Sequence, residues 1–290
     1  MSKKKVTPYL YIIPGLIILL VFVYYPIIKN VEYSFLKWDL FSGTKKFVGI
    51  SNFIKLFKSD KFWLALKNNI LYILLSLLFQ VGLALVFASI IENMKNKKIS
   101  AMFRATFFLP SLISLTIIGL LFSFIYKTDG VLNSILEFVH LGQFETGWLG
   151  NEKTAIFAVI AVSQWKSIGY TMMLFIVAIQ RIPAEVYEAA KIDGATPSRI
   201  FFDITVPLIR DMLKITIIIT ISGGLLVFNE VFIMTNGGPY QSSEVLSTLM
   251  YQNAFVHGNI GYASAIANII LILSVAFSAL QLMSGSKDDK

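Results

Sequence analysis

Cysteine is absent from the 290 residues, and histidine occurs only twice. The chain therefore offers no disulfide bond and no thiolate metal site, and little material for histidine-based catalysis. Charged residues are also scarce, at 14% of the chain against about 25% in an ordinary soluble domain. Hydrophobic residues make up 56%, and the mean hydropathy is +0.71. A chain of this length with so little polar surface is expected to reside in a membrane.

The sequence motifs of common enzyme sites are missing as well. It contains no G-x-x-x-x-G-K-[ST] loop for the phosphates of ATP and no G-x-S-x-G nucleophile elbow. His140 and His257 fall far apart, in loops that we expect to face outward. Most acidic residues lie in loops, and no pair of carboxylates suited to hydrolysis is evident. We therefore expect no catalytic residue, no metal site and no cofactor bound by this chain itself.

Long apolar runs dominate what is present. A bilayer core of roughly 30 Å requires about 20 apolar residues in a helix. Such runs predict six membrane-spanning helices: Tyr9–Ile28, Asn69–Ile91, Ala105–Tyr126, Thr154–Gln180, Ile215–Thr235 and Ala263–Met283. The first run is too long for a signal peptide and has no cleavage site after it, so we expect it to be retained. The predicted fold class is all-α, with residues 1–290 forming a single polytopic membrane domain.

Lysine and arginine residues set the expected orientation, because they concentrate in cytoplasmic loops. The loop Asn236–Tyr262 has neither and is assigned to the outside. With both termini inside, the cytoplasmic side receives Lys3, Lys4, Lys5, Lys95, Lys97, Lys98, Arg104, Arg181, Lys191, Arg199, Arg210, Lys214, Lys287 and Lys290. The segment after the first span contradicts the rule, since this orientation places outside Lys29, Lys37, Lys45, Lys46, Lys55, Lys58, Lys61 and Lys67. The net charge of +8 thus follows membrane topology and does not indicate a nucleic-acid partner.

Residues 181–214, between the fourth and fifth spans, form a cytoplasmic loop with an unusual pattern. Pro183 suits the first position of a helix, and Glu185 then lies in the first turn, near the positive end of the helix dipole. Gly194 permits a left-handed stop. Thr196-Pro197 starts a second helix, with the threonine as N-cap. Two short helices joined by a tight turn predict a docking element under the membrane.

Residues of this loop resemble a known family. Glu188-Ala189-Ala190, followed by Gly194, Ile204 and Pro207, is similar to the EAA signature of permease subunits of ABC importers, except that Val206 stands where Leu is usual. Further blocks resemble the branch that imports sugars and oligosaccharides: Tyr33-Ser34-Phe35, Phe47-Val48-Gly49-Ile50-Ser51-Asn52-Phe53, Phe103-Arg104, Phe108-Leu109-Pro110, Phe228-Asn229, Thr235-Asn236-Gly237-Gly238-Pro239 and Tyr262-Ala263-Ser264-Ala265. The resemblance covers nearly the whole chain.

The resemblance implies that the loop contains a coupling helix, which inserts into a cleft on an ATPase subunit. The residues implied in this contact are Glu188, Ala189, Ala190, Asp193 and Gly194. The alanines would leave a slim face for close approach, and the glutamate would offer a carboxylate to a basic partner. An amphipathic helix lying on the bilayer surface stays open as the alternative.

The implied function is that of the pore-forming, non-catalytic subunit of an ATP-driven importer in the bacterial cytoplasmic (inner) membrane. The implied partners are two ATPase subunits, which bind ATP and Mg, a second homologous permease, and an extracellular or periplasmic solute-binding protein. The implied substrate is a carbohydrate, with an oligosaccharide favoured. A secondary transporter or channel driven by ion gradients is the alternative; such transporters often contain inverted repeats, and none is visible in this sequence.

Polar residues inside the predicted spans are candidates for the transport path, because their burial in a bilayer is costly. Lys166 in the fourth span and Glu230 in the fifth are expected to lie within reach of each other, unless each extends separately to the membrane surface. By the resemblance, sugar contacts fall among residues of the same two spans: Gln164, Trp165, Gly169, Tyr170, Thr171 and Asn229. Ordinary helix packing is the alternative for each of them, and for Gly169 the two interpretations are equal.

Overall fold

The computed structural model describes residues 7–285, with side chains for residues 11–280. The described chain is mostly helical and contains one two-stranded sheet. It divides into two compact units. Unit 1 comprises the described part of Met1–Phe62 together with Leu249–Ile272, and unit 2 comprises Trp63–Thr248 together with the described part of Leu273–Lys290. The lysines at both chain ends that supported the predicted orientation lie outside the described residues.

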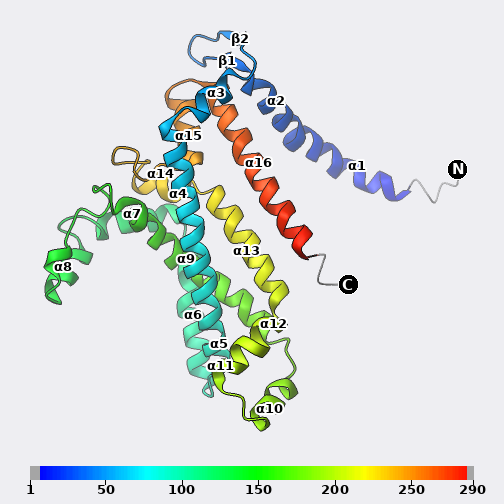
Figure 1. Cartoon of the computed structure of the whole chain (residues 1–290), viewed down its shortest axis with the longest axis vertical. Helices are drawn as coiled ribbons and strands as arrows, with labels where there is room; N and C mark the ends of the chain where they lie inside the picture. The colour runs from blue at the N-terminus through cyan, green and yellow to red at the C-terminus, as the bar shows by residue number, and fades with distance from the viewer. Residues whose placement is uncertain (1–6, 286–290) are drawn as a thin grey trace. The chain divides into compact units, whose positions relative to one another are not determined.

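Unit 1 is built on a long apolar helix, a hairpin and the beginning of the last helix (Figure 1). α1 (Thr7–Leu19) continues through a π-helical turn into α2 (Tyr25–Ser34). The hairpin strands β1 (Leu36–Trp38) and β2 (Lys45–Phe47) follow, and α3 (Ser51–Phe57) comes after them. The side-chain amide of Asn30 donates to Asn268 Oδ1 at 2.7 Å, which joins α2 to α16 (Ile260–Gly285).

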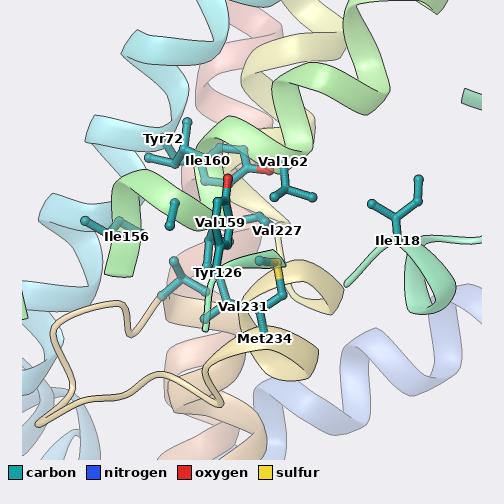
Figure 2. Packing of buried hydrophobic residues seen from close by; sticks show 12 residues of the cluster. Tyr72, Ile118, Tyr126, Ile156, Val159, Ile160, Val162, Val227, Val231 and Met234 are labelled. Atoms are coloured by element: carbon teal, nitrogen blue, oxygen red, sulfur yellow. The ribbon is translucent and has the colours of Figure 1, made fainter. Parts of the chain in front are cut away.

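Unit 2 contains the remaining helices, with α9 (Ala155–Ile179) at its centre. Two hydrophobic clusters form around α9, because more than half of its residues are buried. One of them, shown in Figure 2, joins α9 to residues such as Tyr72, Ile118 and Val231. The helices of this unit are α4 (Asp60–Ser76, which begins in unit 1), α5 (Ala84–Glu92), α6 (Lys97–Leu112), α7 (Leu115–Ile125), α8 (Val131–Phe138), α10 (Ala184–Ile192), α11 (Pro197–Arg199), α12 (Val206–Leu208), α13 (Arg210–Leu225), α14 (Asn229–Met234) and α15 (Leu246–Tyr251, which ends in unit 1).

Within the described residues, four helices are long and apolar enough to cross a membrane, or five if one bent pair counts as a span. The four are Tyr11–Ser34, Asp60–Glu92, Ala155–Ile179 and Ile260–Leu280, so four of the six predicted spans are confirmed as continuous helices. The prediction of an all-α chain is correct only in outline, because β1 and β2 pair as an antiparallel hairpin that the sequence patterns did not indicate.

The third predicted span, 105–126, is not one continuous helix. α6 and α7 meet at a bend of 97° after Leu112. Pro110 lacks the N–H that a helix interior requires, and Ser111 Oγ donates to the carbonyl of Phe108 at 2.6 Å, in competition with the backbone ladder. Apolar composition alone does not reveal such a bend.

The fifth predicted span, 215–235, is also interrupted. α13 ends at Leu225 and α14 begins at Asn229. The buried amide of Asn69 donates to the carbonyls of Gly224 and Leu225, at 2.7 and 3.3 Å. These two carbonyls would otherwise need partners further along the same helix. The side chain of Asn69, in α4, thus supplies the hydrogen bonds that these carbonyls lack at the break.

Candidate functional site

The loop between α9 and α13 has the predicted helix–turn–helix form. α10 spans Ala184–Ile192, and Pro183 is its N-cap, one position before the one expected, with ψ near 140°. Gly194 has φ +75°, so the expected left-handed stop is present. The N–H of Ala195 donates to Ala190 O at 2.9 Å, and the N–H of Gly194 donates to Lys191 O at 3.1 Å. This pair of bonds is a Schellman motif, which satisfies carbonyls at the end of α10.

The second helical segment begins as the sequence predicts. Thr196 is the N-cap of α11, and its Oγ1 accepts from the N–H of Arg199 at 3.4 Å, with Pro197 in the first turn. The segment continues through a π-helical stretch into α12. The hydroxyls of Tyr187 and the buried Thr205 lie 3.3 Å apart, so α10 is tied to this second segment. The loop is therefore an ordered element and not a flexible connection.

One face of α10 is exposed in the part of the chain that the structure describes. Glu185, Glu188, Ala189 and Ile192 follow the i, i+3, i+4, i+7 spacing of a single helix face, and all four are exposed. The opposite side holds Ala190, which is buried, and Tyr187, which is half-buried. Ile192 is 86% exposed, an unusual position for an aliphatic side chain next to two glutamates. We call this set, Glu185, Glu188, Ala189 and Ile192, the coupling face.

The predicted docking residues therefore divide into two groups. Glu188, Ala189, Asp193 and Gly194 are exposed, whereas Ala190 packs inward and supports the helix. An open groove of about 640 Å³ lies beside the loop, between residues of α5 such as Val86 and Ile90 and the segment containing Phe201. Glu92 at the end of α5 holds Arg104 of α6 at 2.5 Å and Gln180 at 3.2 Å. These polar contacts join α5 and α6 to the end of α9, from which the loop extends.

Two of the predicted sugar-binding residues are used in packing. Gln164 is 7% exposed, and its amide donates to Ser76 Oγ at 2.9 Å. Thr171 is buried, and its Oγ1 accepts from Gln80 at 3.2 Å. Both side chains therefore join α9 to the long helix Asp60–Glu92. Trp165 and Tyr170 differ from them, because they are 43% and 48% exposed.

Gly169 has a packing role that the sequence left undecided. A Cβ atom at this position would lie 1.7 Å from the backbone oxygen of Phe107 in α6. An ordinary contact is about twice as long. Only a glycine allows α6 and α9 to approach so closely, and the backbone of α6 covers the position.

Lys166 and Glu230 form no ion pair in the described part of the chain, so their expected contact is absent. Glu230 instead accepts a hydrogen bond from Ser163 Oγ at 3.3 Å, and Ser163 accepts one from the hydroxyl of Tyr72. The Tyr72 hydroxyl oxygen also lies 3.5 Å from the Glu230 carboxylate. Lys166 is half-buried on α9. The partners of Glu230 come from α4 and α9 and are neutral.

Asn229 is exposed at the first position of α14, directly after the break in the fifth predicted span. The residues that set this geometry, Asn68 and Asn69, were missed in the sequence. Asn69 Oδ1 accepts from the N–H of Leu246 at 2.9 Å, and the Asn68 amide donates to the carbonyls of Ser242 and Glu244. Two adjacent asparagines at the start of an apolar run were the available signal.

The described residues contain no group of three or more histidine, cysteine or acidic side chains that could hold a metal ion. His140 and His257 are exposed.

Comparisons with known proteins agree on one family. Residues 80–287 match the family model described as "Binding-protein-dependent transport system inner membrane component". The chain is 46% identical over 282 residues to the probable ABC transporter permease protein YurN of Bacillus subtilis, with 97% of this chain and 96% of that protein covered. It is 32% identical to the arabinooligosaccharides transport system permease protein AraP of B. subtilis, with 98% and 90% covered.

A solved structure has the same fold. It is described as a bacterial ABC transporter involved in the import of the acidic polysaccharide alginate. The matched chain of that transporter superimposes with a TM-score of 0.87 at 24% identity, and 99% of this chain and 98% of that chain are covered.

Proposed function

The chain belongs to the family of inner membrane components of binding-protein-dependent transport systems, and from this premise we propose that it forms half of the pore of an ATP-driven importer for an oligosaccharide. Its own role is non-catalytic, as in the permease components that it matches. Two ATPase subunits bind ATP and Mg and hydrolyse ATP, a second homologous permease completes the pore, and an external solute-binding protein delivers the sugar. The gradient-driven alternative is set aside, since it does not involve a binding protein.

The observation that carries the proposal is the coupling face of α10. An exposed isoleucine beside two glutamates, on a helix that ends in a Schellman turn and precedes a threonine-capped segment, is not covered by the described residues. A partner that covers Ile192 would bury its apolar surface, and basic residues of that partner would pair with Glu185 and Glu188. Pre-organisation of the helix lowers the entropy lost on docking. An ATPase cleft that moves on ATP binding would then move α10, and with it α9 and α13.

The proposed topology has six membrane crossings with both termini in the cytoplasm. The bent pair α6–α7 and the broken pair α13–α14 supply the two crossings that are not single continuous helices. Broken helices place free backbone groups at membrane depth only where protein or a water-filled cavity surrounds them. The two compact units act as one permease domain under this proposal, as the superposition over nearly the whole chain supports.

The proposed sugar contacts are exposed polar and aromatic residues of α9 and of the start of α14. Trp165 and Tyr170 offer flat faces for sugar rings, and Asn229 offers an amide for hydroxyl groups. A relative named for arabinooligosaccharide transport supports the substrate class. Glu230, with Ser163 and Tyr72 beside it, lies next to Asn229 in the chain and supplies further acceptors. Gln164 and Thr171 act indirectly, because they join α9 to the long helix Asp60–Glu92.

Purification of the tagged chain in mild detergent, with mass spectrometry of what accompanies it, tests the proposal. We expect an ATPase that contains a phosphate loop and a second permease. Ile192→Glu and Glu188→Arg should remove the ATPase and retain the permease, whereas Lys191→Ala, on the same helix but outside the coupling face, should retain both. A chain that is isolated alone, stable and without any ATPase would refute the importer.

A further inference from the structure

The hairpin of unit 1 places two lysines directly opposite each other. β1 and β2 pair antiparallel with Lys37 opposite Lys46, and both side chains are exposed. The Cβ atoms of directly opposite residues lie about 4.5–5.5 Å apart on one face of a sheet, where like charges are destabilising. The hairpin thus keeps an unfavourable contact that its own fold does not require.

The two faces of the hairpin differ in character, because side chains alternate along each strand. Lys45 belongs to the other face, where its ammonium lies 3.9 Å from the centre of the Trp38 ring. Trp38 in turn meets Tyr33 edge-on, with ring centres 4.6 Å apart. On that face the ammonium group of Lys45 therefore has aromatic partners. The face of Lys37 and Lys46 carries no other side chain of the two strands.

The nearby acid, Asp39, makes no ion pair with either lysine at contact distance. Asp39 follows β1, and its Oδ1 accepts from the N–H of Ser42 at 2.7 Å. This bond, and to a smaller extent the charge of Lys37, holds the pKa of Asp39 below its usual range. Among the side chains of residues 11–280, neither Lys37 nor Lys46 has an ion pair with Asp39 or with another acid. Both ammonium groups are therefore exposed, and Lys37 has only the longer-range attraction of Asp39.

The hairpin is held rigidly within unit 1. The buried amide of Asn52 donates to Ser34 O at 2.8 Å and to Leu36 O at 2.9 Å. The N–H of Leu40 donates to Gly258 O at 2.8 Å, just before α16. A Cβ at Gly261 would lie 1.8 Å from Leu36 O, so the first turn of α16 packs directly against β1. Figure 1 shows the hairpin at the end of α2 that is farther from α1.

The wider segment is basic on the side where lysines are least expected. Residues 35–62 contain six lysines and two aspartates, a net charge of +4. The proposed topology places them outside the cell membrane, whereas lysines favour the cytoplasmic side. The lysine bias of membrane insertion therefore does not account for the six lysines of this segment. We look instead for a function of these lysines on the outer surface.

We propose that the Lys37–Lys46 face is a docking point for an acidic surface of the external solute-binding protein. The inference rests on the proposed function, which supplies that partner. Two ammonium groups on a rigid strand pair match carboxylates on a folded protein. Lipid binding at an interface relies on apolar side chains beside the basic ones, and this face of the strands has none. Opposite charges steer such an encounter, raise its rate and are screened by salt.

Binding kinetics of the whole transporter test the inference. The complex is placed in nanodiscs of phosphatidylcholine, which has no net charge, and the solute-binding protein that supports uptake is passed over it. Lys37→Gln/Lys46→Gln is compared with Lys55→Gln/Lys58→Gln, which removes the same charge from exposed positions of α3 and the residue after it. We expect the hairpin variant to associate about tenfold more slowly at low salt, with a difference below about twofold at high salt. The control should change by about twofold or less.

The thermal stability of the hairpin variant distinguishes the loss of a docking contact from damage to the fold. Removal of the repulsion should leave the thermal stability of the hairpin variant equal to or above that of the wild type. Equal slowing in both variants, or no slowing in either, would overturn the docking point, as would an effect that requires anionic lipid in the nanodisc. A wild-type complex that neither binds the protein nor transports sugar would instead refute the proposed function.

Discussion

Replacement of Gly169 by alanine should separate the packing role of this residue from a role in sugar binding. The added methyl group would lie 1.7 Å from Phe107 O, whereas an ordinary contact of carbon with oxygen is at least about 3.2 Å. The contact involves backbone on both sides, so no side-chain rotation relieves it. α6 and α9 must move apart by about 1.5 Å, and the phenylalanines beside the contact lose packing.

Overpacking of this kind costs about 1–3 kcal/mol, and we expect the upper end because backbone must shift. In a chain of this size, about 3 kcal/mol lowers the melting temperature by roughly 6–12 °C. The assay is thermal unfolding of the purified complex, followed by size-exclusion chromatography. Gly223→Ala is the matched control, since it is also a helix glycine and its Cβ would meet nothing within 4 Å; alanine should slightly stabilise that helix. Unchanged stability of Gly169→Ala with an altered sugar affinity would refute the packing argument.

Three further outcomes are expected. Asn69→Ala removes hydrogen bonds to two carbonyls and one N–H in a buried site, and it should lower the free energy of unfolding by about 2–4 kcal/mol; retained thermal stability would contradict this role. Thr196→Ala removes the long cap bond of α11 and should cost about 0.5 kcal/mol, with sugar-stimulated ATP hydrolysis reduced more than assembly; equal losses of both would argue against a coupling role. Gln164→Ala should lower thermal stability, since the hydrogen bond of Gln164 to Ser76 is buried. Asn229→Ala should reduce sugar uptake at unchanged thermal stability. The reverse pattern would assign packing to Asn229 and sugar contact to Gln164.

Local patterns in the sequence were sufficient for the cytoplasmic loop. Helix boundaries there depend on proline, glycine and threonine at particular positions, and their preferences act within a few residues. Gly194 adopts the left-handed conformation, and Thr196 caps the next helix, as these patterns predict. Only the position of Pro183 differed, by one residue. The exposed side of α10 also follows from helix periodicity once its ends are known.

Contacts between segments that are distant in the chain could not be predicted from the sequence. Composition predicts Ile215–Thr235 as a single span, yet the amide of Asn69, far away in the chain, takes the carbonyls of Gly224 and Leu225. Gly169 was ambiguous for the same reason, because its role depends on the backbone of Phe107. The expected pairing of Lys166 with Glu230 considered charge alone, whereas Ser163 and Tyr72 lie within hydrogen-bonding distance of the carboxylate.

The sequence by itself thus determined that this protein lies in a membrane, belongs to a non-catalytic permease family and contains a helix–turn–helix between its fourth and fifth apolar runs. These properties follow from composition and from signals that act within one or two helical turns. Only the tertiary structure decided which polar residues in the spans are buried in packing and which are exposed, and where the helices break. A buried hydrogen bond or a backbone contact depends on the partner that folding brings next to it, and that partner is remote in the chain.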